Sequence, residues 1–156
     1  AIYAPLKLLI GPSLGGTAML HAADRTPSCT AAVTLAAPAD PGHVARFFIG
    51  KRPEINQSGS AMITIGGNHF EIREKFFEDI AYAEDGSTLS NFKKPLLICQ
   101  SKDDELLAFE HAERIYKHAG NPASIISLEH ADHLFNVQED SSYLSHIITA
   151  WAKRYI

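Results

Sequence analysis

Residues 7–16 read K-L-L-I-G-P-S-L-G-G, a short apolar run followed by a turn and a segment of small residues. The run Lys7 to Ile10 predicts a strand, and the small residues beyond it predict a helix. The turn between them matches G-x-S-x-G, a motif that presents a serine between a strand and a helix. Glycines on both sides of Ser13 leave out the Cβ atoms that would clash in so sharp a turn. The stretch therefore predicts an α/β fold with Ser13 just beyond a strand.

Further apolar runs predict strands that alternate with helices, which is typical of a parallel sheet covered on both faces. These runs are Ala32 to Ala37, Leu96 to Gln100 and Ala123 to Leu128. Apolar residues at helical spacing from Phe109 to Ala119, and again from Ser141 to the end of the chain, predict flanking helices. We therefore expect a parallel sheet of about four strands.

The middle of the chain, about residues 41–94, breaks this alternation and predicts an insertion. Its stretch Met62 to Ile72 alternates apolar and polar residues around glycines, which predicts a β-hairpin, and Arg73 to Ala83 predicts a helix. We expect this insertion to form a cap over Ser13. Four phenylalanines in it are expected either to line a substrate pocket or to pack against each other: Phe47, Phe48, Phe76 and Phe77.

Two hairpin turns fit the sequence. A Gly67-Asn68 turn would set Ile65 against Phe70, whereas a Gly66-Gly67 turn would set Ile65 against Asn68. The first register pairs two large apolar side chains, so it is the one we expect.

The composition indicates one globular domain over residues 1–156. Of these residues 46% are hydrophobic and 21% charged, and the formal net charge is -4 without a long run of one sign, so neither nucleic acid nor a membrane is an expected partner. Cys29 and Cys99 lie in apolar stretches and are expected to be buried, reduced thiols, which favours the cytoplasm. The apolar stretch near the start is too short to span a membrane, and because the chain enters a strand almost at once we expect further sequence upstream.

Acidic residues and a histidine follow the last two predicted strands. Asp103 and Asp104 come after the third strand and His133 after the fourth. Carboxyl ends of parallel strands meet at one edge of a sheet, so Ser13 and these residues are expected there together. The chain order Ser, Asp, His is that of α/β-hydrolase triads. The residues themselves do not separate the two aspartates.

Each of these residues also has a structural interpretation. A glycine-rich helix start such as that at Ser13 attracts anions without catalysis, an aspartate in such a loop caps the next helix, and a single histidine is often only hydrogen-bonded. His130 and His133 form H-x-x-H, but the spacing does not suit one helix face and no third ligand is evident, so no metal site is expected. The order of all three site residues favours catalysis.

The sequence resembles the C-terminal part of an α/β-hydrolase, and specifically the hydrolase half of bacterial proteins in which this fold is fused to an OsmC-like domain. The resemblance covers essentially the whole chain and rests on I-G-P-S-L-G-G at 10–16, A-A-P-A-D-P at 36–41, P-L-L-I-C-Q-S-K-D-D-E at 95–105, A-D-H-L-F at 131–135 and A-W-A-K-R-Y near the end. Two features depart from this group: Pro12 stands where His is usual, and no OsmC-like domain is found within residues 1–156.

The resemblance implies Ser13 as nucleophile, His133 as base and Asp104, four positions after Gln100, as the residue that orients the base. The backbone amide of Leu14, at the start of the helix, is the expected oxyanion donor. The resemblance further implies a partial α/β-hydrolase fold whose first four strands and second oxyanion donor lie upstream of Ala1, so this chain alone is expected to be a poor catalyst.

The expected function is a serine hydrolase, esterase-like or lipase-like, that cleaves a small acyl ester without a cofactor. The alternative is a non-catalytic, truncated module of the same fold that acts in binding or assembly. In either case the first strand, Lys7 to Ile10, would have one open edge, which favours a homodimer through that strand.

Overall fold

The computed structural model describes residues 4–65, 67–83, 89–90, 92–120 and 122–156. The chain forms two compact units. Unit 1 comprises Ala1–Ala39 and Ser87–Ile156, and unit 2 comprises Asp40–Gly86. Unit 2 begins one residue before the insertion predicted at about 41–94 and ends within it.

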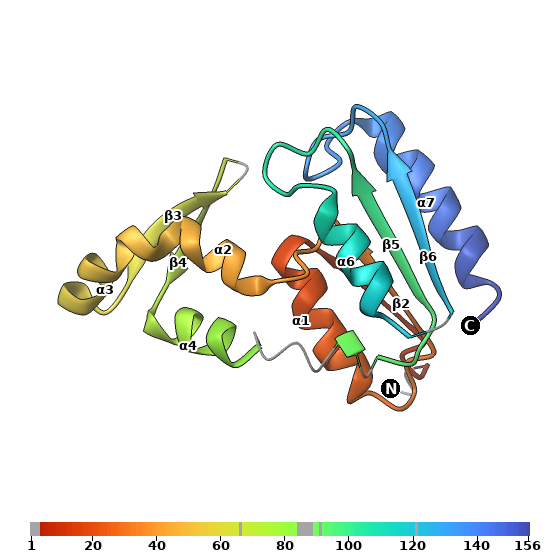
Figure 1. The fold of residues 1–156 in the computed structure, drawn as a ribbon, viewed down its shortest axis with the longest axis horizontal. Coiled ribbons are helices and arrows are strands. Elements are labelled where there is room, and N and C mark those ends of the chain that lie inside the picture. Colours follow the sequence, from red (N-terminus) through yellow and green to blue (C-terminus); the bar gives the residue numbers. More distant parts are fainter. Residues whose placement is uncertain (1–3, 66, 84–88, 91, 121) are drawn as a thin grey trace. The chain divides into compact units, whose positions relative to one another are not determined.

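Unit 1 is built on a parallel sheet of four strands in the order β1-β2-β5-β6 (Figure 1). The strands are β1 (Leu8–Pro12), β2 (Ala31–Leu35), β5 (Leu96–Ser101) and β6 (Ala123–Leu128). All neighbours are parallel, with Leu8 beside Ala31 and Leu96 beside Ala123. The prediction of a four-stranded parallel sheet is confirmed.

Helices cover both faces of this sheet. Helices α1 (Ser13–Asp24) and α6 (Glu110–His118) lie on one face and α7 (Gln138–Ala152) on the other (Figure 1). Along β5, Leu96 and Ile98 belong to the core shared with α1 and α6, while Leu97 and Cys99 belong to the core shared with α7. A strand buried on both faces needs apolar residues at successive positions, which explains the near-continuous runs in the sequence.

The two cysteines are free and buried, as predicted. Burial raises the pKa of the Cys99 thiol to about 12, so this group stays protonated and packs as a small apolar side chain. Among the described residues, no helix combines the length and apolar character needed to cross a bilayer.

Unit 2 contains short helices and one hairpin. Its elements are α2 (Pro41–Phe48), the 3₁₀ turn η1 (Ile49–Lys51), α3 (Arg52–Ser58), β3 (Ala61–Ile65), β4 (Asn68–Ile72) and α4 (Glu74–Ala83). Its core consists of Ile55, Ala61, Ile63, Ile72 and Phe77. Phe48 and Phe76 pack against this core and Phe47 is exposed, so three of the four phenylalanines pack within the unit.

The expected hairpin register is wrong. The strands pair Ile65 with Asn68 and Ile63 with Phe70, the register that the alternative Gly66-Gly67 turn predicted; residue 66 itself lies outside the described residues. Gly67 has a φ of +80°, a conformation that glycine adopts without a Cβ clash, whereas Asn68 is a paired strand residue. Both registers keep the same residues on the same face, so burial did not discriminate between them and the turn geometry decided.

Strand β1 lies at an edge of the described sheet, and we expect residues 1–156, taken by themselves, to self-associate through it. Ile10 is 46% exposed, and an apolar groove of about 370 Å³ beside it is lined by Pro12, Leu35 and residues of α7 such as Ile148. An unpaired edge next to apolar surface favours pairing with a second chain. Light scattering over a range of concentrations should show dimers.

The matched variants are Ile10→Lys and Tyr116→Lys. Tyr116 on α6 is 47% exposed, nearly the same as Ile10, but lies away from β1. A charge next to the edge should weaken the dimer by roughly tenfold, whereas the same charge on α6 should not. A chain that remains monomeric at every concentration would contradict this prediction.

Candidate active site

Ser13 lies where β1 ends and α1 begins. It is the first residue of α1 and has a φ of +46°, in the left-handed region that a non-glycine residue rarely occupies. Such backbone strain persists only where the surroundings impose it, and it is concentrated at functional sites. Leu14 follows in the first helical turn, where backbone amides have no acceptor within the helix. The local geometry thus presents a hydroxyl and a free helix end side by side.

Two glycines allow the chain to turn this sharply: Gly11, as predicted, and Gly16 in place of the predicted Gly15. A Cβ on Gly11 would lie 2.6 Å from the carbonyl oxygen of Gly15, and one on Gly16 would lie 2.6 Å from the Cβ of Ala37. A Cβ on Gly15 would meet only Pro12 Cδ, at 3.7 Å, an ordinary contact. The second glycine that the turn needs is therefore Gly16, because α1 packs there against the segment that follows β2.

A pair of alanine substitutions tests this assignment. Gly16→Ala should lower the free energy of unfolding by about 1–3 kcal/mol, because the methyl group has no space. Gly15→Ala should instead raise it, by up to about 1 kcal/mol, because alanine favours the helix. Denaturant unfolding measures both. Equal effects at the two positions would contradict the account of the turn.

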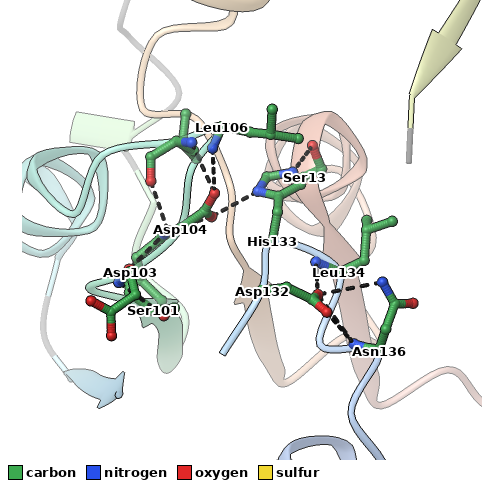
Figure 2. A network of polar contacts seen from close by, with 11 residues as sticks. Ser13, Ser101, Asp103, Asp104, Leu106, Asp132, His133, Leu134 and Asn136 are labelled. Atoms are coloured by element: carbon green, nitrogen blue, oxygen red, sulfur yellow. Dashed lines mark hydrogen bonds and ion pairs between the residues drawn. The ribbon is translucent and has the colours of Figure 1, made fainter. Parts of the chain in front are cut away.

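His133 lies in the loop after β6 and contacts Ser13 (Figure 2). Its Nε2 lies 3.0 Å from Ser13 Oγ, and its Nδ1 lies 2.7 Å from Asp104 Oδ2. An ionised carboxylate only accepts hydrogen bonds, so Nδ1 carries the proton. In the neutral ring Nε2 is then an acceptor, and the Ser13 hydroxyl donates to it. This tautomer is the one that can take a proton from serine.

Asp104, in the loop after β5, has every lone-pair direction occupied. Oδ1 accepts from the backbone amides of Leu106 and Leu107, each at 2.9 Å, while Oδ2 accepts from His133 and from Gln100 Nε2. The side chain is 0% exposed, and that of His133 is 9% exposed. Burial raises the pKa of Asp104, but the hydrogen bonds from His133 and the two amides outweigh it, and the net pKa is lowered. Asp104 is therefore a buried carboxylate that stays ionised.

The neighbouring Asp103 contacts a different histidine. Its Oδ2 accepts from the backbone amide of His130 at 2.6 Å and lies 3.2 Å from His130 Nδ1. Both side chains are largely exposed, at 53% and 89%. The pair joins the loops after β5 and β6 at the surface, so the structure brings Asp104, and not Asp103, to His133.

Asp132 shapes the loop that carries His133. Its carboxylate accepts from the backbone amides of Leu134, at 2.8 Å, and Asn136, at 3.2 Å (Figure 2). Phe135, in the same loop, has a φ of +53° and is buried in the core beneath α7. Asp132 enters the sequence analysis only within the motif A-D-H-L-F, where it is assigned no role of its own. The signal for its role is an aspartate two residues before a loop amide, a spacing typical of an Asx turn.

The H-x-x-H pair formed by His130 and His133 is not arranged as a metal site in the described residues. His130 pairs with Asp103 at the surface, while His133 uses both ring nitrogens on Ser13 and Asp104. Across the described ranges, no group of three or more His, Cys, Asp or Glu side chains is arranged to hold a metal ion.

Searches against protein-family models and against curated proteins gave no match. Solved structures do match. One is the esterase domain of a Rhodothermus marinus protein, which is 32% identical in sequence and superposes with a TM-score of 0.80. The match covers 95% of the present chain and 61% of the Rhodothermus chain. Another is alpha/beta hydrolase domain-containing protein 10 from mouse, which is 20% identical, with a TM-score of 0.71. That match covers 98% of the present chain and 64% of the mouse chain. A monoacylglycerol lipase from Paleococcus ferrophilus is 17% identical, with 94% and 68% covered and a TM-score of 0.70.

These likenesses show the fold. The chain has part of the α/β-hydrolase fold, and it spans 61% of the Rhodothermus esterase domain and 64% of the mouse protein. The expectation of a partial α/β-hydrolase fold is confirmed. The fusion to an OsmC-like domain stays a prediction.

Proposed function

We propose that this chain, which has part of the α/β-hydrolase fold, belongs to a serine hydrolase that cleaves small acyl esters through a covalent acyl-enzyme. One observation carries the proposal: Ser13 at the start of α1, Asp104 in the loop after β5 and His133 in the loop after β6 form one chain of hydrogen bonds, with distances of 3.0 and 2.7 Å. A capped loop or a structural histidine explains each residue singly, but neither explains the alignment of all three.

In the proposed acylation step, Ser13 Oγ attacks the carbonyl carbon of the ester while its proton moves to His133 Nε2. The imidazolium that forms is stabilised by Asp104, which stays ionised. The oxyanion that develops at the carbonyl oxygen accepts a hydrogen bond from the backbone amide of Leu14 at the start of α1. His133 then gives its proton to the leaving alkoxide, and the alcohol departs from the acyl-serine.

Deacylation repeats these steps with water. His133 Nε2 takes a proton from water, whose oxygen attacks the acyl carbon, and the proton returns to Ser13 Oγ as the carboxylic acid leaves. One ester and one water thus yield one acid and one alcohol. The residues described supply the nucleophile, the base and the charge stabilisation, so the proposed reaction uses no cofactor.

Esters are the proposed substrates because the structural neighbours support that chemistry. The Rhodothermus protein carries an esterase domain, and the Paleococcus protein is a monoacylglycerol lipase. We further propose, as the sequence predicted, that the insertion around unit 2 caps the site and shapes the pocket for the acyl group.

The experiment is covalent labelling of the protein that carries this chain. A fluorophosphonate reacts with an activated serine, and peptide mapping then identifies the modified residue. We expect one adduct, at Ser13, together with hydrolysis of a short-chain nitrophenyl ester. A folded protein that gives neither result would instead support the non-catalytic module that acts in binding or assembly.

A further inference from the structure

A buried amide lies at the end of β5, next to the proposed triad. Gln100 is 0% exposed and lies beside Ser127 of β6. Leu96 and Ile98 point to the same side of β5 and pack into the apolar core with α1 and α6. Gln100 is the next residue on this side of β5, but its side chain is polar, and the mechanism above assigns it no role.

The two ends of this amide differ sharply. Nε2 donates to Asp104 Oδ2 at 2.8 Å and to the carbonyl oxygen of Leu107 at 3.0 Å. Oε1 is buried and has no hydrogen-bond partner in the described part of the chain. Exchanging the two ends would place an oxygen against two acceptors, so the donors define the orientation. A buried, unsatisfied oxygen is destabilising, and an apolar side chain would avoid it.

We propose that Gln100 is a positioning residue that holds Asp104 Oδ2 in line with His133 Nδ1. The inference rests on the proposed function, because it is there that Asp104 and His133 act. The carboxylate is held from both sides: Gln100 and His133 donate to Oδ2, and the amides of Leu106 and Leu107 donate to Oδ1. Without the Gln100 amide, the Asp104 carboxylate could rotate without losing a hydrogen bond to β5.

The amide also tunes the charge that His133 meets. Gln100 and His133 share one oxygen, so the amide draws on the negative charge that would otherwise act on the imidazolium. Removing the amide should therefore leave His133 as the only side-chain donor to Asp104 Oδ2 among the described residues. Other ionisable side chains of the two loops lie at the surface, where solvent screens them. They are Lys102, Asp103, Glu105, Glu129, His130 and Asp132.

The test compares Gln100→Met with Thr34→Val. Methionine keeps the length of the side chain but has no donor. Thr34, on the adjacent strand β2, is also 0% exposed, and its hydroxyl likewise lacks a partner among the described residues. Thr34→Val therefore controls for a change of polarity in the same buried sheet. The contact between His133 Nδ1 and Asp104 is read from the NMR signal of the Nδ1 proton, assigned with His133→Gln.

Gln100→Met should shift or broaden the NMR signal of the His133 Nδ1 proton, because Asp104 Oδ2 is then no longer held from the side of the strand. It should also lower kcat by roughly tenfold at unchanged KM, because a displaced imidazole affects the chemical step. Thr34→Val should change neither. A folded Gln100→Met protein with the Nδ1 proton signal and the kcat of the unsubstituted chain would overturn the proposal.

A second measurement does not depend on the folding of that variant. In the unsubstituted chain, the side-chain amide signals of Gln100 should shift as Asp104 is protonated at low pH, and Asp104→Asn should abolish this shift. Gln100 amide signals that stay unchanged while Asp104 is protonated would refute the contact between these two side chains. The measurements also separate the two proposals: a changed Nδ1 signal in Gln100→Met without labelling of Ser13 in the unsubstituted chain counts against the hydrolase, whereas labelling of Ser13 without the changed signal counts against Gln100.

Discussion

Ser13→Ala is expected to abolish fluorophosphonate labelling and to lower kcat for a nitrophenyl ester by up to ~10⁶, the scale seen when a triad serine is removed. The methyl group cannot attack a carbonyl, and His133 Nε2 loses the hydroxyl that lies 3.0 Å away. Any residual turnover would reflect binding and the helix-end amide alone. Labelling is read by mass spectrometry and turnover by release of nitrophenolate.

The control for this variant is Ser145→Ala. Ser145 is exposed on α7, and its hydroxyl donates to the carbonyl oxygen of Ser142 in its own helix. This substitution should leave labelling and turnover unchanged. Labelling that persists in Ser13→Ala would show that the nucleophile is another residue.

Asp104→Asn is expected to lower kcat by up to ~10⁴ while the fold is retained, in line with the measured effect of the same change in a serine protease triad. The amides of Leu106 and Leu107 both donate to Oδ1, so the asparagine oxygen should take that position. Its NH₂ group then faces His133 Nδ1 as a donor. The proton is forced onto Nε2, and the ring can no longer accept the proton of Ser13.

Asp103→Asn is the matched control, one residue away in the same loop. It removes the exposed pairing with His130 and should change kcat/KM by less than about fivefold, since exposed ion pairs contribute little. Steady-state kinetics on both variants, with circular dichroism to verify folding, makes the comparison. If Asp103→Asn shows the large loss instead, the orienting carboxylate would be Asp103.

Local patterns were sufficient for the framework of unit 1. Strands covered on both faces require near-continuous apolar residues, so the runs near Ile10, Val33, Ile98 and Ile126 revealed all four strands of the described sheet. The turn at Ser13 was visible because a strand, small residues and a helix follow each other directly along the chain. Parallel strands end at the same edge, so the order of Ser13, the aspartates and His133 already predicted one shared site.

Contacts between distant segments decided what these patterns left open. Asp103 and Asp104 are equivalent in the sequence, and only the packing of the loop after β6 separates the histidine that each one meets. Gly16 is required because Ala37 lies against it, although the motif itself ends at Gly15. The hairpin followed its turn rather than its largest apolar pair. Local sequence specifies which residues are buried and where the chain can turn, whereas the atoms that meet at a site come from segments far apart, and only folding selects between neighbours of equal chemistry.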